Sequence, residues 1–314
     1  MVASRIAIRL LACALGATTL LAWTQMAGAD GKARTKVRYP ARAASAAAEN
    51  SASRHAGAET GATPNLRSAA ALVVDLDDGR TVYAKNIQSI APIASITKLM
   101  TAMVVLDSGL PLNETVYVDN ADLDMLKHTS SRLRVGTGLT RHDMLRLALM
   151  SSENRAAAAL GRAYPGGTAE FVAAMNRKAV ELGMWNTRFV DSTGLSSENV
   201  STAEDLVRMV RAAYEYPLIR EFTTTAAHEV ATAGGRSLEY RNSNRLVKNP
   251  TWEIGLSKTG YISEAGRCLV MQARIAARSV VIVLLDSWGK YTRIGDANRI
   301  KKWLESTLAH KPLG

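Results

Sequence analysis

Cysteine is scarce in this sequence, which has two among its 314 residues. Cys13 lies in an N-terminal segment that we expect to be removed, which leaves Cys268 without a partner for an intramolecular disulfide. Cys268 occurs in the apolar, strand-like run CLVMQARI, so we interpret it as a small buried hydrophobic residue. A cysteine nucleophile would need a histidine partner, and the neighbouring sequence supplies none.

Metal-binding patterns are also missing from the sequence. A zinc peptidase would show H-E-x-x-H or a comparable pairing of ligands. The five histidines show no such spacing: His55, His128, His142, His228 and His310. The sequence therefore predicts no metal site and no cofactor, and it has no internal repeats.

Long apolar runs are limited to the N-terminus. Two arginines precede the run LLACALGATTLLAW, and the following MAGAD contains an A-x-A site that ends at Ala29. This layout predicts a secretory signal peptide over residues 1–29, cleaved near Ala29. The run is shorter than the roughly 20 apolar residues of a membrane-spanning helix, so an uncleaved anchor is the weaker alternative. Lipid attachment at Cys13 is disfavoured because Arg9 lies too close to it.

The net charge of +11 is strongly basic. Residues 30–66 are rich in Ala, Ser, Gly and Arg without apolar periodicity, which predicts a disordered basic linker. A basic protein favours an anionic partner. For an exported protein we expect anionic wall polymer or a membrane surface rather than nucleic acid, with at most peripheral membrane association.

The pattern from residue 70 onward predicts a β-hairpin followed by a helix. Strand-like runs at 70–76 and 81–84 flank the turn signal DDG. The segment SITKLMTAMVVLDSG has helical spacing and ends at Gly109, a plausible C-cap. This places Ser95 at the N-terminus of a helix.

The middle of the chain, about 113–250, is predicted to be a mostly helical lobe. One helix begins with Thr140 as N-cap, another ends at Gly183, and a third opens with a capping box formed by Ser201 and Glu204. The strings EIGLSKTGY, RCLVMQARIA and SVVIVLLDS then predict three strands, followed by a helix from about 291 to 308. We expect the terminal strands to form one mostly antiparallel sheet, with a substrate cleft between sheet and helical lobe.

The string SITK places Ser95 and Lys98 three residues apart, so that both side chains share one helix face about 5–6 Å apart at Cβ. A serine hydroxyl becomes an effective nucleophile when a neighbouring base takes its proton. A lysine amine does this only when burial or a second cation lowers its pKa. Alone, the pattern is weak, because it arises often by chance and more often marks a helix-capping serine and a surface lysine.

Two further strings carry candidate chemistry. In SEN, Ser152 could relay a proton to a leaving amine and Asn154 could bind a substrate amide, although the string is also a common helix cap. In KTG, Lys258 would supply the second cation and Thr259 would bind a carboxylate. Gly260 would let a peptide approach the strand edge closely, although a routine edge lysine and turn glycine would give the same string.

The order of the three strings changes their weight. S-x-x-K opens a helix, S-x-N follows about 55 residues later in the helical lobe, and K-T-G lies on a strand after it, which is the signature of class A β-lactamases and penicillin-binding proteins. From about 69 to 308 the chain resembles a low-molecular-mass penicillin-binding protein of the D-alanyl-D-alanine carboxypeptidase family, and it is most similar to the D-alanyl-D-alanine endopeptidase branch. The strings that carry this resemblance are APIASITKLMTAMVVLD, LALMSSENRAAA, YPGG, LGMWNTRFVDSTGLS and WGKYTRI.

The resemblance implies an α/β fold of the β-lactamase/transpeptidase type, with a mostly antiparallel sheet flanked by terminal helices plus an all-helical lobe, in a domain spanning 67–312. It implies that Ser95 forms the acyl-enzyme, Lys98 is the general base and Ser152 assists protonation. The implied substrate-binding residues are Asn154, Lys258, Thr259 and Gly260, and the implied oxyanion hole consists of the backbone N–H groups of Ser95 and Tyr261.

The function implied is a periplasmic serine peptidase that hydrolyses D-alanyl-diaminopimelate cross-links of peptidoglycan and is acylated by β-lactams. A carboxypeptidase that trims stem pentapeptides is the close alternative. A class A β-lactamase would also need a glutamate in an E-x-x-L-N string, and Glu170 heads EFVAAMN instead. A non-catalytic wall-binding module is the alternative of another class, against which the intact serine, lysines and Asn154 argue.

Overall fold

The computed structural model describes residues 63–232, 235 and 237–309. The predicted signal peptide and residues 30–62 of the predicted linker lie outside this part of the chain. Leu66, at the end of the predicted linker, is buried against the sheet's outer core. Packing into the domain therefore reaches back at least to this residue.

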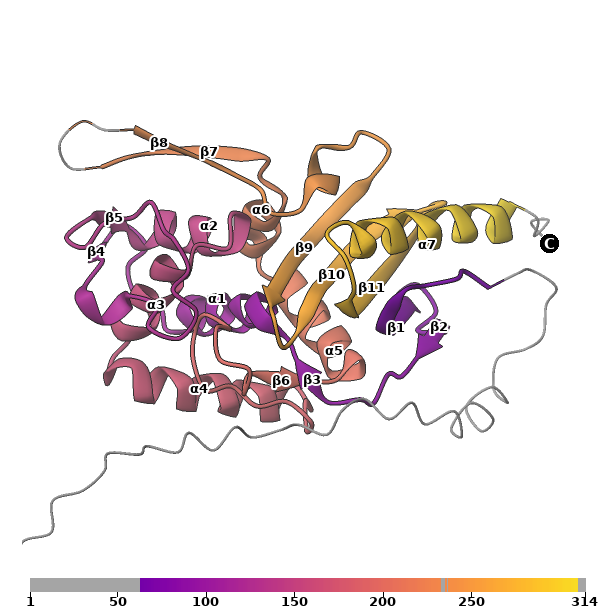
Figure 1. Ribbon diagram of the computed structural model, residues 1–314, viewed down its shortest axis with the longest axis horizontal. Coiled ribbons are helices and arrows are strands. Elements are labelled where there is room, and N and C mark those ends of the chain that lie inside the picture. The colour runs from indigo at the N-terminus through magenta and orange to yellow at the C-terminus, as the bar shows by residue number, and fades with distance from the viewer. Residues whose placement is uncertain (1–62, 233–234, 236, 310–314) are drawn as a thin grey trace, which may run out of the picture. The chain divides into compact units, whose positions relative to one another are not determined.

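A five-stranded sheet forms the centre of the described domain (Figure 1). Its strand order is β2-β1-β11-β10-β9, and every neighbouring pair is antiparallel. The strands are β1 (Ser68–Asp75), β2 (Thr81–Lys85), β9 (Glu253–Ile262), β10 (Gly266–Ile275) and β11 (Arg278–Ser287). The central strand β11 is buried on both faces of the sheet, which fits its continuous apolar sequence.

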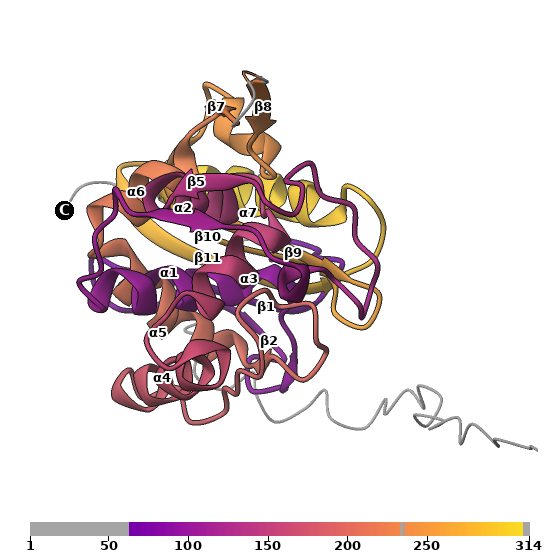
Figure 2. The ribbon, with the colours of Figure 1, turned by 90° about the vertical axis from the view of Figure 1, so that its left-hand side faces the viewer.

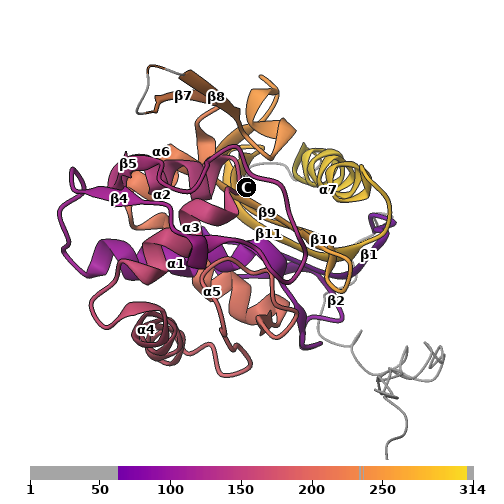
Figure 3. The same cartoon turned by 60° about the vertical axis from the view of Figure 1, so that its left-hand side comes forward.

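Each face of the sheet packs against helices. Helix α7 (Thr292–Ala309) covers one face, where Ile300 and Leu304 meet sheet residues such as Ile282. The opposite face packs against α5 (Ala203–Tyr214), which in turn packs against α1 (Lys98–Asp107). Figure 3 shows α7 and α5 on opposite sides of the sheet.

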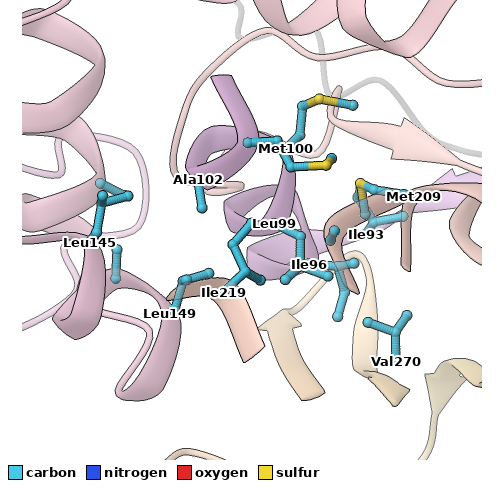
Figure 4. Close-up of a cluster of buried hydrophobic side chains, with 14 of the residues drawn as sticks. Ile93, Ile96, Leu99, Met100, Ala102, Leu145, Leu149, Met209, Ile219 and Val270 are labelled. Atoms are coloured by element: carbon cyan, nitrogen blue, oxygen red, sulfur yellow. The ribbon is translucent and has the colours of Figure 1, made fainter. Parts of the chain in front are cut away.

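Helix α1 is the core of the second lobe. It is buried over most of its length, and the 3-10 turn η1 (Ala94–Thr97) leads directly into it. Leu99 of α1 joins Leu149 and Ile219 in one hydrophobic cluster that also includes Val270 of the sheet (Figure 4). The turn that carries Ser95 is therefore anchored to the core shared by both lobes.

The second lobe contains helices and short two-stranded ribbons. Its other helices are α2 (Arg141–Met150), α3 (Asn154–Arg162), α4 (Gly167–Glu181), α6 (Pro217–Thr224) and the 3-10 helix η2 (Asn120–Asp122). The 3-10 helix η3 (Arg245–Lys248) packs on the α7 side of the sheet instead, through Leu246. The ribbons pair β3 (Ala91–Pro92) with β6 (Val200–Ser201), β4 (Thr115–Tyr117) with β5 (Gly138–Thr140), and β7 (Ala227–Ala231) with β8 (Ser237–Arg241). Figure 2 shows α4 and the β7–β8 hairpin at opposite ends of this lobe.

The α/β fold, the first hairpin, the last three strands and the Thr140 N-cap agree with the sequence predictions. The predicted capping box at Ser201 and Glu204 is wrong by one residue, because Thr202 caps α5 by accepting from Asp205 N–H. Ser201 instead pairs with Ala91 in a ribbon.

The β7–β8 hairpin was not predicted, and the lobe is therefore not purely helical. Val230, Leu238 and Tyr240 are buried while their strand neighbours are more exposed, so the hairpin follows a period of two. Five-residue strands give a weak periodic signal, and the surrounding sequence is dominated by stronger helical patterns.

Candidate active site

Ser95 lies in a strained turn ahead of α1. Ala94 has φ of +48°, a left-handed conformation that is uncommon for a residue with a Cβ. The turn is held by Thr97 Oγ1, which donates to the Ala94 carbonyl at 2.8 Å. Behind it stands Gly194 at φ +80°, where a Cβ would lie 2.0 Å from that same carbonyl oxygen. Only glycine permits this approach, so the 191–196 loop fixes where Ser95 stands.

Lys98 begins α1 and its side chain is fully buried. Its Nζ lies 2.8 Å from Ser95 Oγ, 2.8 Å from Asn154 Oδ1 and 2.6 Å from the Thr193 carbonyl oxygen. Burial lowers the pKa of Lys98 from 10.5 to about 7, although the charges of Asp191 and Glu153 act in the opposite direction. Lys98 is thus placed to exchange a proton with Ser95 near neutral pH.

Asp191 organises the loop that carries Thr193. Its carboxylate accepts hydrogen bonds from Thr193 N–H at 2.6 Å, Gly194 N–H at 2.6 Å, Ser196 N–H at 3.0 Å and Asn199 Nδ2 at 2.7 Å. Burial opposes its ionisation, but these bonds together with that from the Thr193 hydroxyl outweigh burial and lower the pKa of Asp191. The loop therefore holds the Thr193 carbonyl against Lys98 Nζ, and the ionised Asp191 carboxylate adds a negative charge near that amine.

Ser152 and Lys258 form the second serine–lysine contact. Ser152 has φ of +64°, and its Oγ accepts from Lys258 Nζ at 2.9 Å. Lys258 is buried in β9, and burial lowers its pKa well below 10.5, helped by the charges of Lys98 and Arg293. Two ammonium groups repel each other in a site of low dielectric. Lys98 and Lys258, called the lysine pair below, therefore disfavour the state in which both amines are charged.

The remaining predicted residues lie around these two pairs. Asn154 opens α3, and its Nδ2 donates to Thr129 Oγ1 at 2.9 Å while its Oδ1 faces Lys98. Thr259 Oγ1 donates to Ser243 Oγ at 2.7 Å, at the sheet edge formed by β9. The structure thus brings the SEN and KTG strings to the serine and lysine of SITK.

Gly260 lies against the turn that carries Ser95. A Cβ at this position would meet the Ile93 carbonyl oxygen at 2.8 Å and Ser95 N at 3.2 Å. Any side chain would push β9 away from Ser95, so glycine is required for this contact. Tyr261 follows it in β9, with its exposed ring under the Arg267 guanidinium at 4.3 Å.

Sequence comparison now decides the family. The family model described as D-alanyl-D-alanine carboxypeptidase matches residues 57–288. This chain belongs to that family. The predicted resemblance is confirmed, and the chain is a serine peptidase.

Individual members support this assignment. A D-alanyl-D-alanine endopeptidase of Pseudomonas aeruginosa is 52% identical over 242 residues, covering 77% of this chain and 78% of that protein. The D-alanyl-D-alanine endopeptidase of Escherichia coli K12 is 48% identical over 253 residues, covering 80% and 81%. The solved Streptomyces K15 DD-transpeptidase has 28% identity and a TM-score of 0.72 over 77% of this chain and 98% of its own.

Sequence reasoning missed several residues that build this peptidase site. Arg293, at the start of α7, donates to the Gly260 carbonyl at 2.8 Å, and burial lowers its pKa to about 10. Asp191, Gly194 and Ser243 were likewise assigned no role. The strings DSTGLS and WGKYTRI marked two of these regions, but their spacing alone does not show which side chain faces Lys98 or β9.

Two further findings bear on predictions about cofactors and membranes. Among residues 63–232, 235 and 237–309, no three His, Cys, Asp or Glu side chains gather as a metal-binding group. No helix within the same ranges has the length and apolar character needed to cross a bilayer. Cys268 is buried, as predicted, and burial raises the pKa of its thiol to about 11.

Proposed function

We propose that this peptidase is a periplasmic endopeptidase that cleaves the D-alanyl cross-links of peptidoglycan. The observation that carries this preference is the pattern of identity among its relatives. The relatives named D-alanyl-D-alanine endopeptidase are 52%, 48% and 36% identical to this chain, whereas those named carboxypeptidase from Bacillus subtilis and Mycobacterium tuberculosis are 31% and 32% identical. Peptidoglycan stem peptides would be its substrate and β-lactams its covalent inhibitors.

In the proposed first half-reaction, Ser95 Oγ attacks the D-alanyl carbonyl carbon and Lys98 accepts the hydroxyl proton. The 2.8 Å contact and the burial of Lys98 support this role. The backbone N–H groups of Ser95 and Tyr261 would stabilise the oxyanion of the tetrahedral intermediate. Loss of one such donor typically costs about 3–4 kcal/mol of transition-state stabilisation.

Collapse of the intermediate then breaks the peptide bond and leaves the D-alanyl group esterified to Ser95. The departing amine takes a proton from Ser152, which is reprotonated from the lysine pair through the 2.9 Å contact with Lys258. Asn154 would bind the substrate backbone, Thr259 the carboxylate beside the leaving nitrogen, and Gly260 would leave room for the peptide.

In the second half-reaction, water attacks the ester carbonyl and its proton enters the lysine pair. The Ser95 oxygen leaves with a proton from the same pair, so the enzyme returns to its starting state. No metal or cofactor is needed to balance these steps. Activity that persists in the presence of a chelator would support this account.

In the proposed organisation, a signal peptide at 1–29 is followed by a basic linker at 30–66 and by the peptidase domain at 67–312. Leu66, the last residue of the linker, already packs into the domain. Export fits a substrate that lies outside the cytoplasmic membrane. The basic linker would favour anionic wall polymer.

Digestion of isolated peptidoglycan, followed by product analysis, tests the substrate preference. Loss of cross-linked dimers with a matching gain in tetrapeptide monomers is expected for an endopeptidase. Loss of terminal D-alanine from pentapeptide monomers, with dimers intact, would instead establish the carboxypeptidase. A wall-binding module would bind the material and change neither product, as the Ser95→Ala variant should.

A further inference from the structure

A large cavity adjoins the proposed active site, between the β7–β8 hairpin and the segment 130–132. It has a volume of about 720 Å³. Its walls come from Arg132, from Ser151 and Glu153, and from β8, including Glu239 and Tyr240. None of these residues takes part in the chemistry proposed above.

The cavity lies on the side of the site from which the amine would leave. Ser151 and Glu153 flank Ser152, the proposed donor to that amine. β8 ends two residues before Ser243, whose Oγ contacts the Thr259 hydroxyl, the proposed ligand of the carboxylate beside the leaving nitrogen. A chain that continues from the leaving amine past these two groups therefore meets the cavity.

The cavity wall contains a buried hydrogen-bonding group that has no partner. Tyr240 is 1% exposed, and its hydroxyl makes no hydrogen bond within the described residues. Burial raises the pKa of Tyr240 to about 12, helped by the charge of Glu153, so the hydroxyl keeps its proton at neutral pH. An unpaired buried hydroxyl is costly unless a ligand satisfies it.

The charged residues of the cavity wall are Arg132, Arg241, Glu153 and Glu239, and Arg132 is the one that stacks on Tyr240. Its guanidinium lies 3.9 Å from the centre of the Tyr240 ring, and its Nη1 donates to the Glu239 carbonyl at 2.5 Å. Arg132 forms no ion pair with any acidic residue of the described chain, whereas Arg241 beside it is paired with Glu239. A stacked, oriented guanidinium with free N–H groups is suited to a carboxylate.

We propose that this cavity binds the acceptor stem peptide, the strand of the cross-link that departs as the amine, through a carboxylate on Arg132 and a hydrogen bond to the Tyr240 hydroxyl. This inference rests on the proposed endopeptidase function and names its specificity site. Carboxypeptidase action releases a single D-alanine, which is held at Thr259 and is too short to fill a neighbouring cavity of this size. The cavity therefore favours cross-linked substrates over pentapeptides.

The test compares two reactions that share Ser95 and differ in the group that leaves. One is cleavage of a purified cross-linked muropeptide dimer, and the other is acylation by benzylpenicillin, which needs no acceptor strand. The variants are Arg132→Ala and Tyr240→Phe, which keeps the ring under Arg132. Arg134→Ala is the matched control, because Arg134 is an exposed arginine two residues away that lies outside this cavity.

We expect Arg132→Ala to lower kcat/KM for the dimer at least about tenfold, because a charged hydrogen bond to the substrate carboxylate is lost. Tyr240→Phe should lower it about fivefold, because a neutral hydrogen bond is lost. Penicillin acylation should stay within about twofold of wild type for all variants. In the Ser95→Ala background, Arg132→Ala should weaken equilibrium binding of the intact dimer by about tenfold as well.

Equal losses in dimer cleavage and penicillin acylation would overturn the proposal, since they would indicate damage to the site common to both reactions. An equal effect of Arg134→Ala would also overturn it, because general attraction of anionic wall material would then suffice. If wild type does not cleave dimers, the proposed endopeptidase function fails. The binding measurement in Ser95→Ala would still decide whether the cavity holds the acceptor strand.

Discussion

The acylation rate should depend on pH through Lys98. Its pKa of about 7 means that the amine changes from charged to neutral within the physiological range. Only the neutral amine accepts the Ser95 proton, so the rate should rise with pH through about 7 and level off above it. A lysine with the ordinary pKa of 10.5 would instead be about 0.03% neutral at pH 7 and would give a rate still rising at pH 9.

The size of the effect follows from the same value. A group with a pKa of 7 is about 9% neutral at pH 6 and about 91% neutral at pH 8, so the second-order acylation rate should increase about tenfold between these pH values. Stopped-flow measurement with benzylpenicillin, at constant ionic strength, gives this rate without a need for turnover. Lys98→Arg is the control, because an arginine stays protonated and should abolish the rate across the range.

A rate that is constant between pH 6 and pH 8, or that falls as pH rises, would refute the assignment of Lys98 as the base. A rise centred near pH 10 would show that burial does not lower its pKa as inferred. Only the first of these outcomes would make the Ser95–Lys98 contact structural rather than catalytic.

Three further substitutions probe the framework around the site. Gly194→Ala should lower acylation at least about 100-fold by displacing the Ala94 carbonyl, whereas Gly167→Ala, also at positive φ but facing open space, should leave the acylation rate of the folded protein unchanged. Lys258→Met should reduce acylation about 10²–10⁴-fold in the same assay without lowering the melting temperature, because it replaces a buried amine that forms no ion pair with an acid among the described residues. Asp296→Ala should lower the free energy of unfolding by about 3 kcal/mol in urea titrations, because the buried carboxylate accepts hydrogen bonds from the backbone N–H groups of Arg67 and Ser68 at the start of β1. Acylation of the folded protein should persist.

Much of the fold could be predicted because local patterns and packing agree. The runs that became β9, β10 and β11 are apolar enough to be buried on both faces, and the hairpin β1–β2 carries a strong turn signal. The α5 start was misplaced because Ser201 and Thr202 both stand three residues before an acid. Ser201 pairs with Ala91, which lies 110 positions away in the sequence, and this leaves Thr202 as the cap of α5. The sequence near residue 201 does not reveal this long-range pairing.

The site was predictable in its residues but not in its environment. Ser95, Lys98, Ser152 and Lys258 follow from motif order. The burial that lowers the pKa of Lys98, and the loop that presents the Thr193 carbonyl, depend on contacts across about 95 residues of sequence. Tyr240 gave no signal, because its unpaired hydroxyl is a property of the folded hairpin.

The most direct test of the account is the intact mass of the protein after incubation with benzylpenicillin, followed by peptide mapping of the adduct. One penicilloyl group per chain, located on Ser95 and lost in Ser95→Ala, is the predicted result. An adduct on any other residue, or full labelling of Ser95→Ala, would contradict the claim that the hydroxyl beside Lys98 is the nucleophile.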